Sequence, residues 1–142
     1  MLVKARFGLL SALILIGGCQ AAPVQPSLYD RLGGQPAIVA VVDDFVANVA
    51  QDTAINKRFQ GIDLAKLKRL LVEQVCEAAG GPCKYTGRDM KTAHKGMDIS
   101  DADFNAMAGD MSKTLAKFRV PDRESSEVMA LLGSMRRDIV GQ

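Results

Sequence analysis

The sequence lacks the patterns that indicate a β-sheet, a nucleic-acid-binding surface or a hydrolytic site. No stretch of its 142 residues alternates between apolar and polar side chains for long enough to predict a strand. No basic cluster marks a surface that would neutralise phosphates. The chain has one histidine, His94, with no evident nucleophile or carboxylate partner, so hydrolysis is the least favoured chemistry. It also has no internal repeat and no low-complexity tract.

Long apolar runs are absent too, apart from one near the N-terminus. Met1 to Arg6 carries two basic residues, Phe7 to Ile16 is almost wholly apolar, and Gly17-Gly18-Cys19 places small residues before a cysteine. The apolar run is shorter than the roughly 20 residues that a membrane-spanning helix needs. This segment resembles the lipobox of bacterial lipoproteins, in which the signal is removed before the cysteine and the cysteine is acylated.

The lipobox resemblance divides the chain into three parts. Residues 1–18 are predicted to be a lipoprotein signal peptide, residues 19–26 the lipidated Cys19 with a flexible tether, and residues 27–142 one domain. Loss of Lys4 and Arg6 with the signal makes the mature chain neutral, and no nucleic-acid partner is expected. Gln20 gives no signal for inner-membrane retention. We therefore expect an exported domain that faces the periplasm from the outer membrane, with membrane contact only through its lipid anchor.

Cys76 and Cys83 flank a helix stop and turn, Ala78-Ala79-Gly80-Gly81-Pro82, which could fold back and bring the two sulfurs together. Export to an oxidising compartment favours a disulfide between them. The alternative is two buried cysteines that act as small hydrophobic side chains. Two cysteines are too few ligands for a paired-cysteine zinc site.

Apolar residues recur at helical spacing over nearly all of residues 27–142, which predicts an all-α domain. The last predicted helix carries an apolar stripe that runs from Val128 to Ile139. Four earlier helices are predicted to begin at residues that commonly cap or start a helix. These are Ser27 with Asp30, Pro36, Asp63, and Ser100 with Asp103.

His94 lies on an apolar helical stripe with Met90 and Met97, in a short predicted helix of about Arg88 to Gly96. A neutral imidazole binds iron, and apolar neighbours keep water from a porphyrin face, so His94 is a candidate axial ligand for haem iron. A single histidine on an apolar face is more often a hydrogen-bonded core residue. Since no Cys-x-x-Cys-His motif is present, covalent haem attachment of that kind is excluded.

An ordered set of motifs from Ser27 to the C-terminus is more specific than any one of its members. The set is Leu28-Tyr29-Asp30-Arg31-Leu32-Gly33-Gly34, Phe45, Phe59, Gly80-Gly81-Pro82, and Tyr85-Thr86-Gly87-Arg88-Asp89-Met90 followed by His94. Its order and its Tyr-Thr-Gly to His spacing resemble the group 1 truncated haemoglobins. The resemblance implies a globin-like, two-over-two helical sandwich with a non-covalent b-type haem.

The resemblance also implies roles for individual residues. His94 would be the proximal iron ligand, and Phe59 would wedge against the porphyrin. On the distal side this chain departs from the family, because Val46 replaces the usual tyrosine and the third helix offers leucines where a polar donor is common. The other implied haem contacts are Tyr85, Met90, Met97, Phe104 and Met107 near the proximal side, and Leu67, Leu70 and Leu71 on the third helix.

An apolar distal side predicts weak oxygen binding. Bound dioxygen has partial superoxide character, so a donor hydrogen bond stabilises it by about 1.5 to 3 kcal/mol. Its loss raises oxygen dissociation roughly 10- to 150-fold, whereas carbon monoxide and nitric oxide depend less on a donor. Gln74 is the alternative donor, although its place between Glu73 and Val75 predicts that it faces water.

Three functions follow from these observations. The favoured one is reversible binding of a diatomic gas such as oxygen, nitric oxide or carbon monoxide. The second is nitric oxide dioxygenation, in which a reductase restores ferrous iron, and the apolar distal side counts against it. The third is a haem-free structural or interaction lipoprotein, which the retained His94 and Phe59 disfavour. Four cations are candidates for the haem propionates, namely Lys57, Lys68, Arg88 and Lys91.

Overall fold

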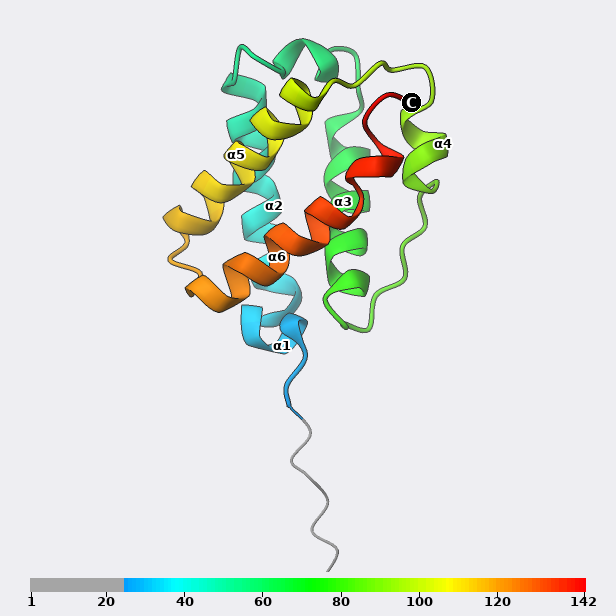
Figure 1. Cartoon of the computed structure of the whole chain (residues 1–142). Helices are drawn as coiled ribbons and strands as arrows, with labels where there is room; N and C mark the ends of the chain where they lie inside the picture. The colour runs from blue at the N-terminus through cyan, green and yellow to red at the C-terminus, as the bar shows by residue number, and fades with distance from the viewer. Residues whose placement is uncertain (1–24) are drawn as a thin grey trace, which may run out of the picture.

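The computed structural model describes residues 25–142, and over these residues it is helical and has no strand (Figure 1). The predicted signal peptide, the lipidation at Cys19 and most of the tether lie outside the described residues. Within residues 25–142, no helix has the length and apolar character needed to cross a membrane. The elements are α1 (Leu28–Leu32), α2 (Gly34–Gln51), η1 (Asn56–Phe59), α3 (Leu64–Ala78), α4 (Met90–His94), α5 (Asp101–Lys117), α6 (Asp122–Ser134) and η2 (Arg136–Asp138).

Side-chain caps determine where the helices begin. At α1, the Ser27 hydroxyl oxygen accepts the Asp30 N–H (3.1 Å) and the Asp30 carboxylate accepts the Ser27 N–H (3.2 Å). Ser100 and Asp103 make the same reciprocal pair at α5. Asp63 accepts a backbone N–H in the first turn of α3. Each cap satisfies a donor that the helix itself leaves free, and the predicted starts are confirmed.

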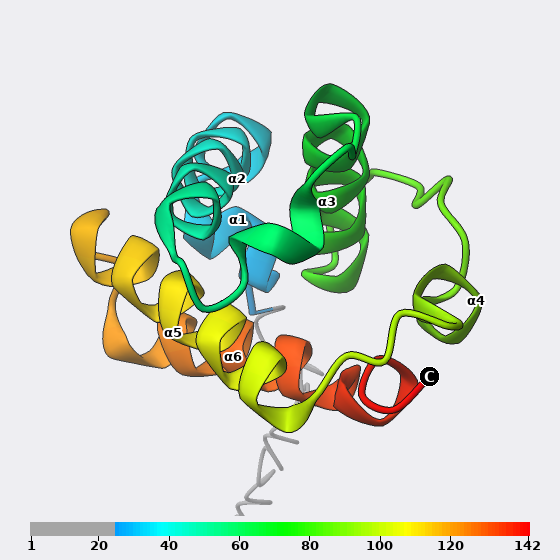
Figure 2. The ribbon, with the colours of Figure 1, turned by 90° about the horizontal axis from the view of Figure 1, so that it is seen from above.

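Two pairs of helices form the framework. Figure 2 shows α2 and α3 side by side as one layer, with α5 and α6 as the other. Helix α2 packs against both α3 and α5, and α5 packs against α6. Helix α2 begins after Gly33, whose φ of 96° suits glycine, and Pro36 lies in its first turn as predicted. The arrangement is the all-α, two-over-two sandwich that the sequence resemblance implied.

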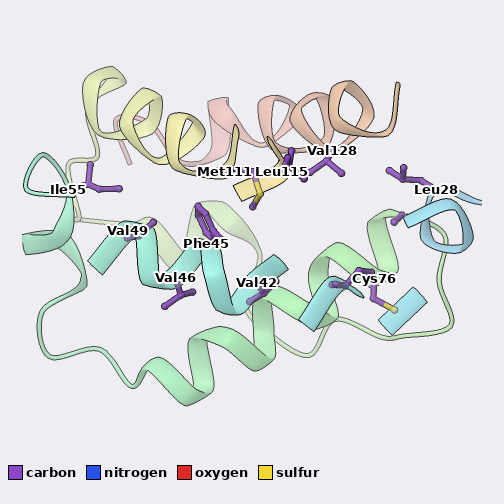
Figure 3. Close-up of a cluster of buried hydrophobic side chains, with 12 residues drawn as sticks. Leu28, Val42, Phe45, Val46, Val49, Ile55, Cys76, Met111, Leu115 and Val128 are labelled. Carbon is purple, nitrogen blue, oxygen red and sulfur yellow. The ribbon is translucent and has the colours of Figure 1, made fainter. Parts of the chain in front are cut away.

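The main hydrophobic core lies around α2, which packs between α3 and the α5–α6 layer (Figure 3). Five residues of α2 are each 5% exposed or less, and Met111, Leu115 and Val128 complete the contact from the other layer. Full burial of such a side chain contributes about 1.5 to 3 kcal/mol. The buried face of α2 therefore makes it the structural centre of the domain. Its five buried residues are Ile38, Val42, Phe45, Val46 and Val49.

Helix α4 is shorter than its predicted range of Arg88 to Gly96. The Asp89 carboxylate accepts the Thr92 N–H (2.9 Å), and this cap starts the helix at Met90. Gly96 follows the helix with a φ of 77°, which a helix does not accommodate. Local capping therefore removes about two residues from each end of the prediction.

The final helix also differs from its prediction, because α6 ends at Ser134 and Ile139 lies beyond η2. Gly133 is a poor helix former, and the Ser134 hydroxyl donates to a backbone carbonyl three residues earlier, which favours an end at this point. Ile139 is nevertheless buried, since η2 folds back toward α4. There it packs with Ile99 and Phe104 in a second, smaller core.

Candidate functional site

The segment that joins α3 to α4, residues 79–89, is bonded covalently to α3. Cys76 and Cys83 form a disulfide with their Cα atoms 5.7 Å apart. The turn between them needs a glycine at position 81. A Cβ on Gly81 would lie 2.5 Å from the Tyr29 ring and 2.8 Å from the Cys76 carbonyl oxygen. Of the two alternatives that the sequence allowed, the structure has the disulfide.

Two glutamates of α3 hold the same connecting segment by hydrogen bonds. The Glu73 carboxylate accepts the Thr86 backbone N–H (3.0 Å) and the Thr86 hydroxyl (2.6 Å). The Glu77 carboxylate accepts the Tyr85 backbone N–H (3.1 Å). The hydrogen bond from the Thr86 hydroxyl is the main reason why the pKa of Glu73 is lowered, and Arg69 adds to the effect.

The Tyr-Thr-Gly motif has a packing reason in this segment. The Tyr85 ring lies so close over Gly87 that a Cβ there would collide with it. The Tyr85 hydroxyl donates to the Arg88 carbonyl oxygen (2.8 Å). Burial of the ring raises the pKa of the Tyr85 hydroxyl, which keeps it a donor. The motif thus fixes the path of the chain just before α4.

The single histidine is held in the tautomer that suits a metal ligand. His94 Nδ1 lies 2.8 Å from the Met90 carbonyl oxygen. Because a carbonyl oxygen only accepts, Nδ1 carries the hydrogen, and Nε2 of the neutral ring keeps its lone pair. Histidines that bind metals commonly donate their other N–H in this way, which fixes the orientation of the ring.

His94 lines a cavity of about 480 Å³ that α2, α3, the connecting segment, α4, α5 and Ile139 surround. This volume lies within the range of about 300 to 1,000 Å³ that is usual for ligand and cofactor pockets. Met107 also lines the cavity, as the resemblance implied. The structure brings all nine predicted cofactor contacts together in this lining: His94, Phe59, Tyr85, Met90, Leu67, Leu71, Val46, Met97 and Phe104.

Several lining residues had no signal that the sequence analysis used. Ile55 and Ile99 are buried, but they lie outside the regular helices and so outside any helical periodicity. Their hydrophobicity within turn sequences is the one signal that could have found them. Ile139 is on the apolar stripe of the last predicted helix, but it was not predicted to lie in the site. All three extend the apolar lining beyond the predicted set.

The wall formed by α2 and α3 has few hydrogen-bond donors. All the lining residues of α2 are apolar, and Val46 is 5% exposed. On α3, the three leucines that the sequence placed on the distal side, Leu67, Leu70 and Leu71, face the cavity. The polar lining residues of α3 are Lys66, Arg69 and Gln74.

Gln74 faces the cavity, so the expectation that it faces water was wrong. Its side-chain Nε2 lies 3.3 Å from the Met90 sulfur and 3.3 Å from the Met135 sulfur. Met90 begins α4, and Met135 lies between α6 and η2. The periodicity of α3 alone could not show that these elements cover the flank on which Gln74 lies.

The cations of the cavity lining differ from those predicted. Of the four predicted cations, only Arg88 is in the lining. Lys57, Lys68 and Lys91 lie outside it, and Lys68 instead pairs with an aspartate of α2 (2.9 Å). Long side chains at helix ends reach in directions that sequence position does not determine. The lining cations that the sequence analysis missed are Arg58, Lys66 and Arg69.

Comparisons with known proteins agree with this fold. The family model for bacterial-like globins matches residues 27–140. The group 1 truncated haemoglobin of Synechocystis sp. is 35% identical over 122 residues, which cover 82% of this chain and 98% of the relative. That of Mycolicibacterium paratuberculosis is 34% identical over 113 residues, which cover 80% and 83%.

Solved structures give the same result. The Fe(III) form of truncated haemoglobin from Tetrahymena pyriformis superposes with a TM-score of 0.79 at 28% identity, over 82% of this chain and all of that one. The 2/2 haemoglobin from Synechococcus sp. superposes with a TM-score of 0.77 at 30% identity, over 82% and all of that chain. The chain therefore belongs to the bacterial-like globin family. Within that family its relatives are the group 1 truncated haemoglobins, as the ordered motifs indicated.

Proposed function

We propose that this protein binds b-type haem non-covalently through His94 and uses it to bind a diatomic gas reversibly. The observation that carries the proposal is the single imidazole in the cavity, with Nδ1 bonded to the Met90 carbonyl oxygen and Nε2 free to accept a metal. When bound, haem supplies an iron that can coordinate oxygen, nitric oxide or carbon monoxide. The relatives are named haemoglobins, which supports the same cofactor.

The cavity lining fits haem in its chemistry. Aromatic and thioether side chains, among them Phe59, Phe104 and Met97, offer an apolar surface to the porphyrin and exclude water from it. Cations in the same lining fit the two carboxylates that haem carries. These cations are Lys66 and Arg88, since Arg58 and Arg69 of the same lining pair with Asp103 and Glu73.

The absence of a donor on α2 gives the proposed site its preference among gases. Val46, Leu67 and Leu71 exclude water but donate no hydrogen bond, so we expect oxygen to leave quickly. Nitric oxide and carbon monoxide need a donor less. Nitric oxide dioxygenation requires oxygen to stay until nitric oxide arrives, so a short residence time counts against that activity and its reductase.

We also propose that the domain is exported and held at the envelope by a lipid on Cys19, facing the periplasm from the outer membrane. The lipobox pattern at Gly17-Gly18-Cys19 is the basis of this proposal. The disulfide between Cys76 and Cys83 supports it, because such bonds persist in oxidising compartments.

Visible absorption spectra of the full chain test the proposed cofactor. We expect the parent, supplied with haem, to show a Soret band in its ferric and ferrous forms, and His94→Ala to lose it. Lys91→Ala, an exposed change on the same helix, is the matched control and should keep the band. A parent with no Soret band would reject haem binding and leave the haem-free structural lipoprotein as the function.

A further inference from the structure

The helix that carries His94 is too short to be stable without contacts to other elements. Helix α4 has five residues, and isolated helices shorter than about 12 residues are marginal in water. It packs against η2, which is itself a short 3-10 segment. The orientation of His94 therefore depends on side chains that bind α4 to the longer helices.

Gln74 is such a side chain. It extends from α3, and its amide nitrogen contacts the sulfur of Met90 on the α4 side and the sulfur of Met135 on the η2 side, each at 3.3 Å. The backbone carbonyl of Met90 is the group that accepts the His94 Nδ1–H (2.8 Å). One residue, Met90, thus connects Gln74 to the imidazole.

Contacts between an amide nitrogen and thioether sulfurs, as Gln74 makes, are not what a residue that only fills space would need. A polar group in an apolar cavity is costly unless it is hydrogen-bonded, and thioether sulfur is a weak acceptor. A leucine would pack among methionines without that cost. The two contacts of the Gln74 amide nitrogen join α4 to η2, because one sulfur belongs to Met90 of α4 and the other to Met135, which precedes η2.

The direction of these contacts also separates Gln74 from the gas-binding wall. Val46, Leu67 and Leu71 form that wall, whereas the Gln74 amide is bonded to the methionine that precedes His94 by one turn. One of its contacts is thus with the helix that carries the proposed iron ligand, and the other is with Met135 beside η2.

We propose that Gln74 is a positioning residue that holds Met90 and Met135 together and so sets the orientation of the His94 imidazole, rather than a donor to the gas ligand. The proposal rests on His94 as the iron ligand. Groups that orient a metal-binding histidine also tune the metal bond, so Gln74 affects the strength of the iron–imidazole bond without contacting the cofactor iron.

The test compares Gln74→Leu with Gln51→Leu, which removes an exposed amide from the end of α2. Resonance Raman spectra of the ferrous, haem-loaded full chain report the iron–histidine stretching band. We expect Gln74→Leu to shift and broaden this band and to speed haem loss roughly two- to tenfold, and Gln51→Leu to match the parent. An unchanged band in Gln74→Leu overturns the proposal. If oxygen dissociation then also becomes tenfold faster or more, Gln74 is instead a donor to the gas ligand.

A double-mutant cycle shows whether Gln74 acts through Met90. Once Met90→Leu has removed the sulfur, we expect Gln74→Leu to cause little further shift of the band. Equal shifts of the band in the parent and in the Met90→Leu background would show that Gln74 acts by another route and would reject the proposed connection.

A measurement on the haem-free full chain separates this proposal from the proposed cofactor. Proton NMR follows solvent exchange of the His94 Nδ1–H, and we expect faster exchange in Gln74→Leu than in Gln51→Leu. A parent that fails to bind haem would reject the proposed function, whereas equal exchange in the two variants would reject the positioning role. Circular dichroism of both variants confirms that the comparison is between folded proteins.

Discussion

The wall of the cavity formed by α2 and α3 is held in a different way from the wall that carries His94. Helix α2 has 18 residues, buries five apolar side chains and packs against both α3 and α5. Helix α4 has five residues, and a disulfide, two glutamates and a glutamine of α3 hold it and the segment before it. Dispersed apolar packing supports the first wall, while a few specific contacts support the second.

This difference shows how a small globin domain combines a stable framework with a fixed position for one side chain, the proposed iron ligand His94. Apolar packing is non-directional and stabilises the framework, but it tolerates small shifts in side-chain position. Hydrogen bonds and a covalent bond have defined geometry, so they suit the wall that carries the proposed iron ligand. Four changes to the chain probe the two walls, in order of expected effect.

Phe45→Ala, in the wall formed by α2 and α3, should have the largest effect on the stability of the domain. Phe45 is 5% exposed in the main core, so its loss leaves a cavity and should lower the free energy of unfolding by about 3 to 5 kcal/mol. Denaturant unfolding measures the change. Val39→Ala, on the exposed face of the same helix, should cost less than about 1 kcal/mol. Equal losses in the two variants would contradict a framework centred on the buried face of α2.

Removal of the disulfide should have the next largest effect on stability, and it changes the wall that carries His94. The Cys76→Ala/Cys83→Ala double variant loses a cross-link between residues seven apart, and we expect it to be about 2 to 3 kcal/mol less stable. Haem loss should also become faster, because the connecting segment leads into α4. Denaturant unfolding and transfer of haem to an acceptor protein measure the two effects. A less stable domain with an unchanged rate of haem loss would show that the disulfide does not support the His94 wall.

Val46→Tyr should add a hydrogen-bond donor to the wall of the proposed gas site formed by α2 and α3. We expect oxygen dissociation to slow by roughly 10- to 150-fold, measured by stopped-flow displacement, because a phenol can donate to the bound gas. Val46→Phe adds similar bulk without a hydroxyl and is the matched control. Equal rates for the two variants would mean that space in the cavity, and not the lack of a donor, controls oxygen release.

The pH dependence of the connecting segment should be the smallest effect. The pKa of Glu73 is lowered in the folded protein, chiefly by the Thr86 hydroxyl, so the unfolded chain binds a proton more readily. The stabilisation is present above the ordinary glutamate pKa of about 4.3 and is lost as pH falls through the lower folded value. Hydrogen exchange of the Thr86 amide between about pH 6 and pH 3 follows it. Thr86→Val should show a flatter dependence at residues 85–87, and an unchanged profile would contradict the assignment.

Much of the fold follows from local sequence patterns. The caps at Ser27, Asp63 and Ser100 are contacts within one helical turn, so their residue types predict them directly. The buried face of α2 follows from its spacing of apolar residues. The ends of α4 and α6 were less predictable, because Asp89 and Ser134 each offer a side-chain contact that competes with helix continuation.

The residues of the candidate site also fall into a predicted group and a group that the sequence did not predict. The residues that the motif order assigned to a cofactor all line the cavity, because the family resemblance carries tertiary information that periodicity does not. The direction of Gln74 and the identity of the lining cations were not predictable in this way. Each depends on contacts between helices that are distant in the sequence, such as the pairing of Lys68 with Asp43.

The sequence by itself determined the all-α class, the capped starts of α1, α3 and α5, the single imidazole at position 94 and the apolar character of the residues around it. These properties depend on composition and on interactions within a few residues. Only the tertiary structure decided that Gln74 reaches Met90 and Met135, and that Ile139 closes the cavity after α6 has ended. Those outcomes depend on how α3, α4 and η2 pack against one another, and packing joins residues that no local pattern connects.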